Sequence, residues 1–215
     1  MRIFGKVIVF LLPLMPRFLV RWISRRYVAG DSLEKATIVL KKLDDSGFST
    51  TIDVLGEEIN TLGEAKLFFD EYVRVLDTIS QNKFNANISI KPTAFGLLID
   101  KEKSYEMIAE LVSQAKEKEI FVRLDMEDHR VTEYTIELLL KLHEMGFDNV
   151  GTVLQARLFR TKEDIINIAR TLNECTDFRI CKGIYLEPKE ISHTNYSEIV
   201  ESFCECIDSM LDTNS

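Results

Sequence analysis

Five polar side chains lie at or near the ends of short strand-like runs, where they could act together. Lys91, Asp125, Gln155 and Lys182 each end such a run, and Arg179 lies slightly deeper in the last one. If the runs are parallel strands, their carboxyl ends meet at one rim, where the working residues of barrel enzymes gather. Lysine, aspartate and arginine at one rim would form a charge-complementary site for a small zwitterion or for the edge of an anionic cofactor.

Two other interpretations of these charges stay open. They could form an ion-pair network that only closes the interior of a barrel, since buried charges tend to be paired. Alternatively, the acidic cluster Asp125, Glu127, Asp128 and His129 could bind a divalent metal through oxygen ligands. Strand alternation puts only Asp125 and Glu127 on one side, so we expect no metal. The sequence contains no glycine-rich phosphate-binding fingerprint of the P-loop or G-x-G-x-x-G type.

The elements that must position these residues follow a β-α-β-α order. Short runs rich in β-branched residues alternate with longer segments whose apolar residues recur every three or four positions. This alternation predicts parallel strands joined by right-handed helical crossovers. The expected strands are Thr50–Leu55, Ala86–Lys91, Ile120–Asp125, Asn149–Gln155 and Phe178–Lys182, and the expected helices between them are Glu64–Ile79, Lys103–Lys118, Thr132–Met145 and Lys162–Leu172.

The strand interiors favour a barrel over an open sheet covered by helices on both faces. Central strands of a doubly wound sheet are almost continuously apolar, whereas here Ile88 and Ile90 alternate with Asn87 and Ser89. We therefore predict an α/β fold: an incomplete (β/α)8 TIM-like barrel of about five βα units, preceded by N-terminal helices. The predicted division is an N-terminal helical segment at 1–48 and a partial barrel at 49–215.

Composition limits the functional classes. The chain has 215 residues and a formal net charge of −8. This charge argues against binding to a phosphate backbone, so we expect no nucleic-acid partner. The four cysteines all fall in the last quarter, which favours reduced thiols and a cytoplasmic protein. The N-terminal apolar run Val7–Leu14 is too short to span a bilayer. It either packs on the protein or rests on an anionic membrane surface as a peripheral contact at the inner membrane.

Six segments in sequence order resemble motifs of one family of flavoenzymes. Together they extend from about Arg25 to Pro188, so the resemblance covers most of the chain. The segments are Arg26-Tyr27-Val28-Ala29-Gly30, Asp53-Val54-Leu55-Gly56-Glu57, Ser89-Ile90-Lys91-Pro92-Thr93, Arg123-Leu124-Asp125-Met126-Glu127-Asp128, Val153-Leu154-Gln155-Ala156 and Arg179-Ile180-Cys181-Lys182-Gly183-Ile184-Tyr185. On these residues the sequence resembles the proline dehydrogenases, in their monofunctional bacterial form.

The resemblance implies a distorted barrel that binds FAD noncovalently, oxidises L-proline to 1-pyrroline-5-carboxylate and passes electrons to a membrane quinone. By position, it implies that Asp125 and Arg179 are catalytic, with Asp125 orienting the proline amine and Arg179 approaching the reactive flavin nitrogen. Lys91 and Tyr185 would contact the substrate. The residues it assigns to the cofactor are Met126, Gln155, Lys182, Gly183 and Ile184.

Two departures from the family pattern bear on activity. Ile184 stands where the family usually has a smaller alanine, which could crowd the substrate ring. The late strands and the final helix with its arginine pair are not found in the sequence, so we expect a C-terminally truncated proline dehydrogenase that alone binds FAD weakly and turns over poorly. An inactive remnant or interaction module and a metal-dependent barrel hydrolase are the alternatives.

Overall fold

The computed structural model describes residues 16, 19, 23, 28–57, 59–173 and 176–213. They belong to two compact units, which meet in the sequence between Phe48 and Ser49. The N-terminal unit contains helix α3 (Leu33–Asp45), whose first turn is capped by the Ser32 side chain. The apolar run Val7–Leu14, with its predicted packing or membrane contact, lies outside the described residues.

The second unit repeats a strand-helix pair along the chain. The strands are β1 (Thr50–Asp53), β2 (Ala86–Ile90), β3 (Val122–Leu124), β4 (Val150–Gln155) and β5 (Phe178–Cys181). The helices are α4 (Leu62–Asn82), α5 (Lys101–Glu117), α6 (Thr132–Glu144), α7 (Thr161–Thr171) and α8 (Tyr196–Asp212), and a short 3-10 turn, η2 (Pro92–Phe95), follows β2.

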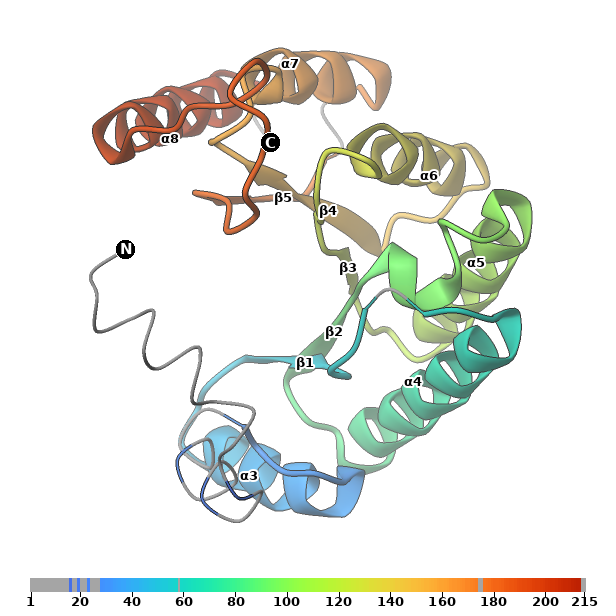
Figure 1. The fold of residues 1–215 in the computed structure, drawn as a ribbon. Coiled ribbons are helices and arrows are strands. Elements are labelled where there is room, and N and C mark those ends of the chain that lie inside the picture. The colour runs from blue at the N-terminus through green and yellow to red at the C-terminus, as the bar shows by residue number, and fades with distance from the viewer. Residues whose placement is uncertain are drawn as a thin grey trace. The chain divides into compact units, whose positions relative to one another are not determined.

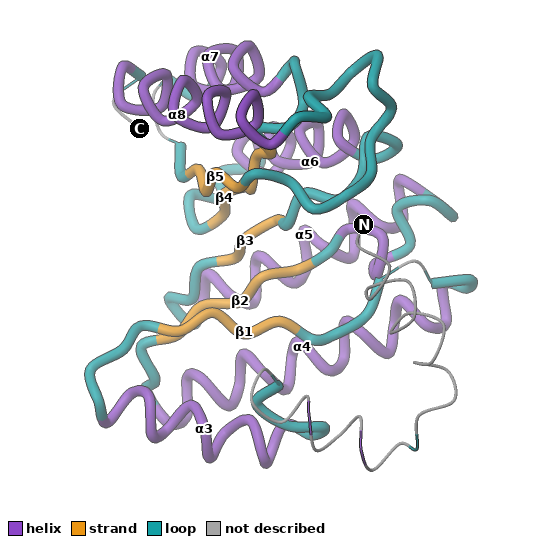
Figure 2. Tube along the Cα trace, turned by 60° about the vertical axis from the view of Figure 1, so that its left-hand side comes forward, coloured by secondary structure: helices purple, strands orange, loops and turns teal. Residues whose placement is uncertain are grey.

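The strand order in this unit identifies the class of fold. All neighbouring strands are parallel and their spatial order, β1-β2-β3-β4-β5, is their sequence order. When every right-handed crossover steps to the next strand in the same direction, all crossover helices lie on one face. Figure 1 shows α4 to α8 along one side of the strands, and Figure 2 shows the same two layers from another direction. The prediction of a partial (β/α) barrel of five strands is confirmed.

The two faces of the sheet differ as the alternating pattern predicts. Ile88, Ile90, Val122 and Leu124 are fully buried, on the face that the helices cover. The residues between them face the other way, and the parallel register places one row of polar side chains level across three strands. That row is Asp53, Ser89 and Arg123.

Helix α4 shows how local sequence forms the covering layer. Its buried residues recur at helical spacing, from Ala65 and Phe69 through Tyr72 to Ile79. Thr61 caps the first turn by accepting from the Glu64 amide, while the Glu64 carboxylate accepts from the Asn60 amide. The Thr61 bond satisfies an amide that the helix itself leaves unpaired, and the Glu64 bond holds the residue before the N-cap.

None of the helices among the described residues is long and apolar enough to cross a membrane.

Candidate active site

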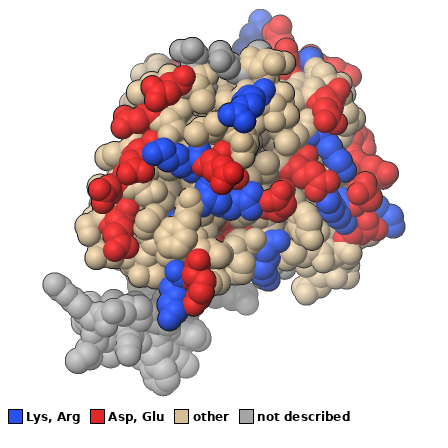
Figure 3. All heavy atoms as spheres, turned by 90° about the horizontal axis from the view of Figure 1, so that it is seen from above, with Lys and Arg blue, Asp and Glu red and all other residues tan. Residues whose placement is uncertain are grey.

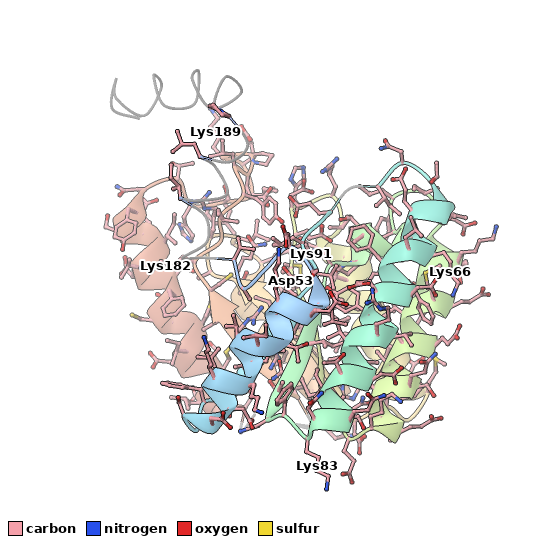
Figure 4. The ribbon with its side chains drawn as sticks, turned by 90° about the horizontal axis from the view of Figure 1, so that it is seen from below. Asp53, Lys66, Lys83, Lys91, Lys182 and Lys189 are labelled. Atoms are coloured by element: carbon pink, nitrogen blue, oxygen red, sulfur yellow. The ribbon has the colours of Figure 1, made fainter. Side chains whose placement is uncertain are left out.

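Four charged side chains form a chain of alternating sign at the carboxyl ends of the strands. Lys91 Nζ lies 2.8 Å from Asp53 Oδ2 and 3.6 Å from Asp125 Oδ2. On the far side of Asp125, Arg179 Nη2 lies 2.5 Å from Oδ1. The order is therefore carboxylate, ammonium, carboxylate, guanidinium, with two charges of each sign. Figure 4 shows Asp53 and Lys91 next to each other, apart from Lys182 and Lys83.

Strand geometry brings these residues together. Asp53 is the last residue of β1, Lys91 and Asp125 directly follow β2 and β3, and Arg179 lies within β5. All four occupy the positions that alternate with the buried apolar ones, so their side chains leave the sheet on the face opposite the helices. The hydroxyl of Ser89 adds a hydrogen bond to Asp125 Oδ2 at 3.2 Å.

The surroundings of Lys91 keep its ammonium charged. Burial lowers the pKa of this group, but the hydrogen bond and the charge of Asp53, helped by Asp125 and Glu57, outweigh it, and the pKa is raised overall. The side chains of Lys91 and Asp53 are 19% and 28% exposed, so the pair is shielded from water more than a surface pair would be. Shielding strengthens the attraction between opposite charges.

A tyrosine from the helical layer reaches the same strand ends. The Tyr72 hydroxyl donates to the backbone oxygen of Ser89 at 2.7 Å, lies 3.2 Å from Asp53 Oδ1 and accepts from the Val54 amide at 3.2 Å. Its ring is buried and packs against Phe95 at 5.7 Å between ring centroids. Burial, together with the charge of Asp53, raises the pKa of Tyr72, so the phenol stays protonated.

A second buried group lies at the ends of β3 and β4. The Gln155 side-chain amide donates to the backbone oxygens of Met126 and Glu127 at 3.1 and 2.7 Å. The Glu127 carboxylate accepts from the amide and the hydroxyl of Thr93, and burial raises its pKa despite these hydrogen bonds. The carbonyl oxygen of the Gln155 side chain is buried and has no hydrogen-bond partner among the described residues.

The loop between β5 and α8 is tied to three other strand ends. Tyr185 donates from its hydroxyl to Glu57 at 3.2 Å, and its backbone oxygen accepts from the Arg157 guanidinium. His129 contacts Glu187 through both its backbone amide, at 3.1 Å, and its ring nitrogen Nδ1, at 2.6 Å. These contacts hold the loop at the carboxyl end of the sheet.

The structure places the predicted site residues in three groups. Lys91, Asp125 and Arg179 form the charged chain. Met126 contacts Gln155 through its backbone oxygen, and Gly183 lies so close to Gln155 that an added Cβ would come within 2.8 Å of the side-chain oxygen. Tyr185 lies on the tied loop, as described above.

Two predicted cofactor residues, Lys182 and Ile184, lie outside the charged chain. Lys182 turns to α8, where its Nζ donates to the Tyr196 hydroxyl at 2.9 Å. Ile184 is 86% exposed on the loop. The sequence interpretation also left Asp53 and Tyr72 out of the site. Asp53 had a usable signal, because strand alternation places it on the polar face; Tyr72 had none, because a tyrosine in an apolar helical stripe looks like core.

The acidic cluster considered for a metal is split by its contacts. Asp125 faces Lys91 and Arg179, Glu127 faces Thr93, and Asp128 pairs with Arg130 at 2.6 Å. Across the described ranges, no group of three or more His, Cys, Asp or Glu side chains could hold a metal ion.

On the face drawn in Figure 3, acidic and basic side chains are interspersed.

These features define a segment of a (β/α) barrel with a charged site at the carboxyl ends of its strands. A family model described as proline dehydrogenase matches residues 36–209. The chain therefore belongs to the proline dehydrogenase family.

Named relatives agree with the family match. The chain is 34% identical to proline dehydrogenase 1 of Bacillus subtilis over 79% of its own length and 55% of that protein. It is 30% identical to proline dehydrogenase 2 of the same organism over 86% of its length and 61% of that protein, and 29% identical to the Deinococcus radiodurans proline dehydrogenase over 84% and 59%. The chain thus spans a little over half the length of these relatives.

Solved structures support the fold. Proline utilization A (PutA) from Bdellovibrio bacteriovorus, inactivated by N-propargylglycine, superposes with a TM-score of 0.82 at 24% identity, covering 90% of this chain and 25% of that one. A PutA variant from Bradyrhizobium japonicum gives a TM-score of 0.70 at 19% identity, covering 86% and 22%.

Proposed function

We propose that this chain carries the flavin-ring and substrate-amine half of a proline dehydrogenase, which oxidises L-proline to 1-pyrroline-5-carboxylate. The observation that carries the proposal is the alternating chain Asp53–Lys91–Asp125–Arg179 at the strand ends. Its middle carboxylate faces two cations, and the whole cluster is balanced in charge. Such a cluster suits a zwitterionic amino acid, because the substrate adds one charge of each sign.

The residues at the ends of β4 and β5 fit a flavin ring. A flat ring needs backbone that it can approach closely and hydrogen-bond partners aimed at its edge. Gly183, at φ +91°, offers backbone without a side chain, and the unpartnered Gln155 oxygen beside it is an acceptor for a ring N–H. FAD bound here would accept the hydride that proline loses. Gln155, Gly183, Arg179 and Met126 would hold it.

Each charged residue then has its own task. Asp125 accepts from the substrate nitrogen and orients it, since its carboxylate lies between the two cations. Arg179 holds the Asp125 carboxylate by a hydrogen bond on one side, and the charge of Lys91 balances it from 3.6 Å on the other. Tyr185, tied to Glu57 and Arg157, would border the substrate ring from the β5–α8 loop. Hydride can leave the carbon next to nitrogen only from the unprotonated amine, so the extra proton on the substrate nitrogen would first pass to the Asp125 carboxylate or to water.

From the family resemblance alone we further propose the electron acceptor and the place of action. Electrons pass to a membrane quinone, and the protein works in the cytoplasm with a peripheral contact at the inner membrane. The residue range 49–215 is the catalytic domain in this proposal, and 1–48 is a helical segment that precedes it.

The test is flavin binding followed by dye reduction with proline. With FAD added in excess to offset weak binding, the purified 215-residue protein should gain a resolved flavin absorption spectrum, and proline should bleach it and reduce a dye slowly. Asp125→Ala and Arg179→Met should each lower the rate of dye reduction by about 100-fold or more while leaving the fold intact. A protein that binds no FAD after reconstitution would overturn the proposal, and FAD binding without turnover would favour a cofactor-binding remnant.

A further inference from the structure

Lys91 faces two carboxylates, and its ammonium lies closer to Asp53 than to Asp125. Its Nζ lies 2.8 Å from Asp53 Oδ2, within hydrogen-bond distance, and 3.6 Å from Asp125 Oδ2, beyond it. Asp125 instead receives close contacts from Arg179 at 2.5 Å and Ser89 at 3.2 Å. The carboxylate that the proposed function assigns to the substrate is therefore the one to which Lys91 is less closely bound.

The two oxygens of Asp53 have separate partners. Oδ2 receives the Lys91 ammonium, whereas Oδ1 faces the Tyr72 hydroxyl at 3.2 Å. That hydroxyl is itself fixed, because it donates to the Ser89 backbone at 2.7 Å and accepts from the Val54 amide. Val54 follows Asp53 directly, so Tyr72 holds both the side chain of Asp53 and the backbone next to it. A buried ring on α4 thereby fixes the direction of a carboxylate on the opposite face of the sheet.

We propose that Asp53, held by Tyr72, is a positioning residue that draws the Lys91 ammonium toward β1 and keeps it beyond hydrogen-bond distance of Asp125. This rests on the proposed function, because that function makes Asp125 the group that meets the substrate nitrogen. Without Asp53, the ammonium has Asp125 as its closest remaining carboxylate and would move onto it. Asp125 would then be occupied by the protein's own lysine.

The groups that face Lys91 come from several elements, and Asp53 dominates among them. Asp53 contributes both a hydrogen bond and a charge, whereas Asp125 and Glu57 contribute only through their charges. Lys91 should therefore be harder to deprotonate than a free lysine. Asp125 is already paired with Arg179, so even after the ammonium moves onto Asp125, the loss of Asp53 should remove part of the difference.

The experiment is competitive acetylation of the 215-residue protein with trace acetic anhydride, read by mass spectrometry of the Lys91 peptide from pH 7 to pH 12. Only the neutral amine reacts, so the rate follows deprotonation. In the wild-type protein the Lys91 rate should still rise about tenfold per pH unit at pH 10, as for a pKa above the ordinary value of about 10.4. In Asp53→Asn it should level off about one pH unit earlier, because an opposite charge in contact shifts a pKa by at least that much.

Two further variants separate positioning from loosening of the structure. Asp53→Glu keeps the carboxylate, so the acetylation rate of Lys91 should level at the same high pH as in the wild-type protein. Asp70→Asn is the matched control: it also removes a carboxylate that contacts a lysine, Lys66, at 2.7 Å, but on the exposed surface of α4, and it should leave the Lys91 profile unchanged. A change that only makes Lys91 more accessible to the reagent raises its rate equally at every pH, without moving the pH at which the rate levels.

Two results would overturn the inference. One is a Lys91 profile that is the same in the wild-type protein and in Asp53→Asn. The other needs no variant and so does not depend on folding of Asp53→Asn: a wild-type Lys91 that levels at or below the ordinary lysine pKa. Neither measurement uses FAD or proline. A protein that shows the Lys91 shift but binds no flavin would contradict the proposed function and leave this inference standing.

Discussion

Arg179 and Asp125 are joined across an intervening strand. Arg179 lies opposite Val153 of β4 in the sheet register, and the guanidinium passes to Asp125, which follows β3, to reach Oδ1 at 2.5 Å. Two strand spacings amount to about 10 Å, a distance that the arginine and aspartate side chains span together. The contact therefore links the last strand of the sheet to the middle of the charged chain.

This link should be measurable as a coupling free energy. The Asp125 side chain is 18% exposed and the Arg179 side chain 46% exposed, so the pair is partly shielded from water. A double-mutant cycle of Asp125→Asn with Arg179→Gln, followed by urea unfolding, should therefore give a coupling of about 1 kcal/mol.

The control is a pair on the surface of α4. Lys66 and Asp70 lie four residues apart, and their side chains are 58% and 56% exposed. Their coupling in the same kind of cycle should be about 0.4 kcal/mol, as for an ordinary helix-surface pair. Equal coupling in the two pairs would show that the linked strands add nothing to an ordinary surface contact.

The Tyr72 hydroxyl should stabilise the fold through two backbone hydrogen bonds, one that it donates and one that it accepts. Tyr72→Phe keeps the buried ring against Phe95 but leaves the Val54 amide and the Ser89 backbone oxygen without this partner. Buried groups that lose a partner cost about 1–3 kcal/mol, and urea unfolding should show a loss of that size.

Tyr196→Phe is the control for this prediction. Tyr196 is 68% exposed, and among the described residues its hydroxyl accepts a single hydrogen bond, from Lys182. The free energy of unfolding should therefore change by less than about 0.5 kcal/mol, as for other surface substitutions. If the two variants lose equal stability, the hydroxyl of Tyr72 does not hold the strand ends.

The sequence predicted the sheet better than it predicted the ends of the strands. The alternation of Ile88 and Ile90 with polar neighbours was enough to separate the two faces, because a half-covered sheet imposes it. The first strand was expected to reach Leu55, but it ends at Asp53. There the Val54 amide donates to Tyr72 instead of to the sheet. That partner lies 18 residues further along the chain, and no local pattern reveals it.

For the site, strand alternation predicts which side chains share a face, whereas the family motif assigned residues from both faces to the same site. Arg179 and Lys182 are three residues apart, so a regular strand turns them to opposite faces. The structure does this: Arg179 reaches Asp125, and Lys182 reaches Tyr196 on a covering helix. Asp53 follows the same rule and joins the charged chain. What alternation cannot supply is which of several carboxylates a lysine will choose, because that depends on the distances between strand ends.

Glu127 should make the stability of the protein fall with rising pH. Burial raises its pKa, so the folded state holds this proton more tightly than the unfolded state. The stability that Glu127 contributes is complete below the pKa of an unfolded glutamate, about 4.3, and is lost as the pH rises through the higher folded value. Glu127→Gln removes this loss. Its free energy of unfolding should therefore improve, relative to the wild-type protein, between pH 4.5 and pH 7.5 in urea titrations.

Glu137→Gln provides a control of opposite sign. Lys101 and then Lys141 hold the pKa of Glu137 below its usual value. Its stabilising contribution is therefore present above the unfolded pKa and is lost as the pH falls. Relative to the wild-type protein, this variant should become less stable, not more, as the pH rises from about 2.5 to about 5, and should change little above that. The same sign in both variants would contradict the assignment of Glu127 as a buried carboxyl group that prefers its proton.

Gly183 and Gly146 allow the space beside Gln155 to be tested separately from backbone strain. Their φ angles are +91° and +87°, so alanine at either position carries the strain of a left-handed conformation, about 1 kcal/mol. An added Cβ meets nothing within 4 Å at Gly146, but at Gly183 it comes within 2.8 Å of Gln155 Oε1 and 3.1 Å of Arg157 Cβ. Gly183→Ala should therefore cost about 1–2 kcal/mol more than Gly146→Ala in urea unfolding.

The same pair of variants bears on cofactor binding. If the Gln155 oxygen is the acceptor for a flavin N–H, a methyl group beside it displaces either the oxygen or the ring, and Gly183→Ala should weaken FAD binding by about tenfold or more, as for the loss of one hydrogen bond. Gly146→Ala, on the loop after α6, should bind FAD as the wild-type protein does. Equal FAD affinity in both variants, measured by quenching of flavin fluorescence, would place the ring away from Gly183.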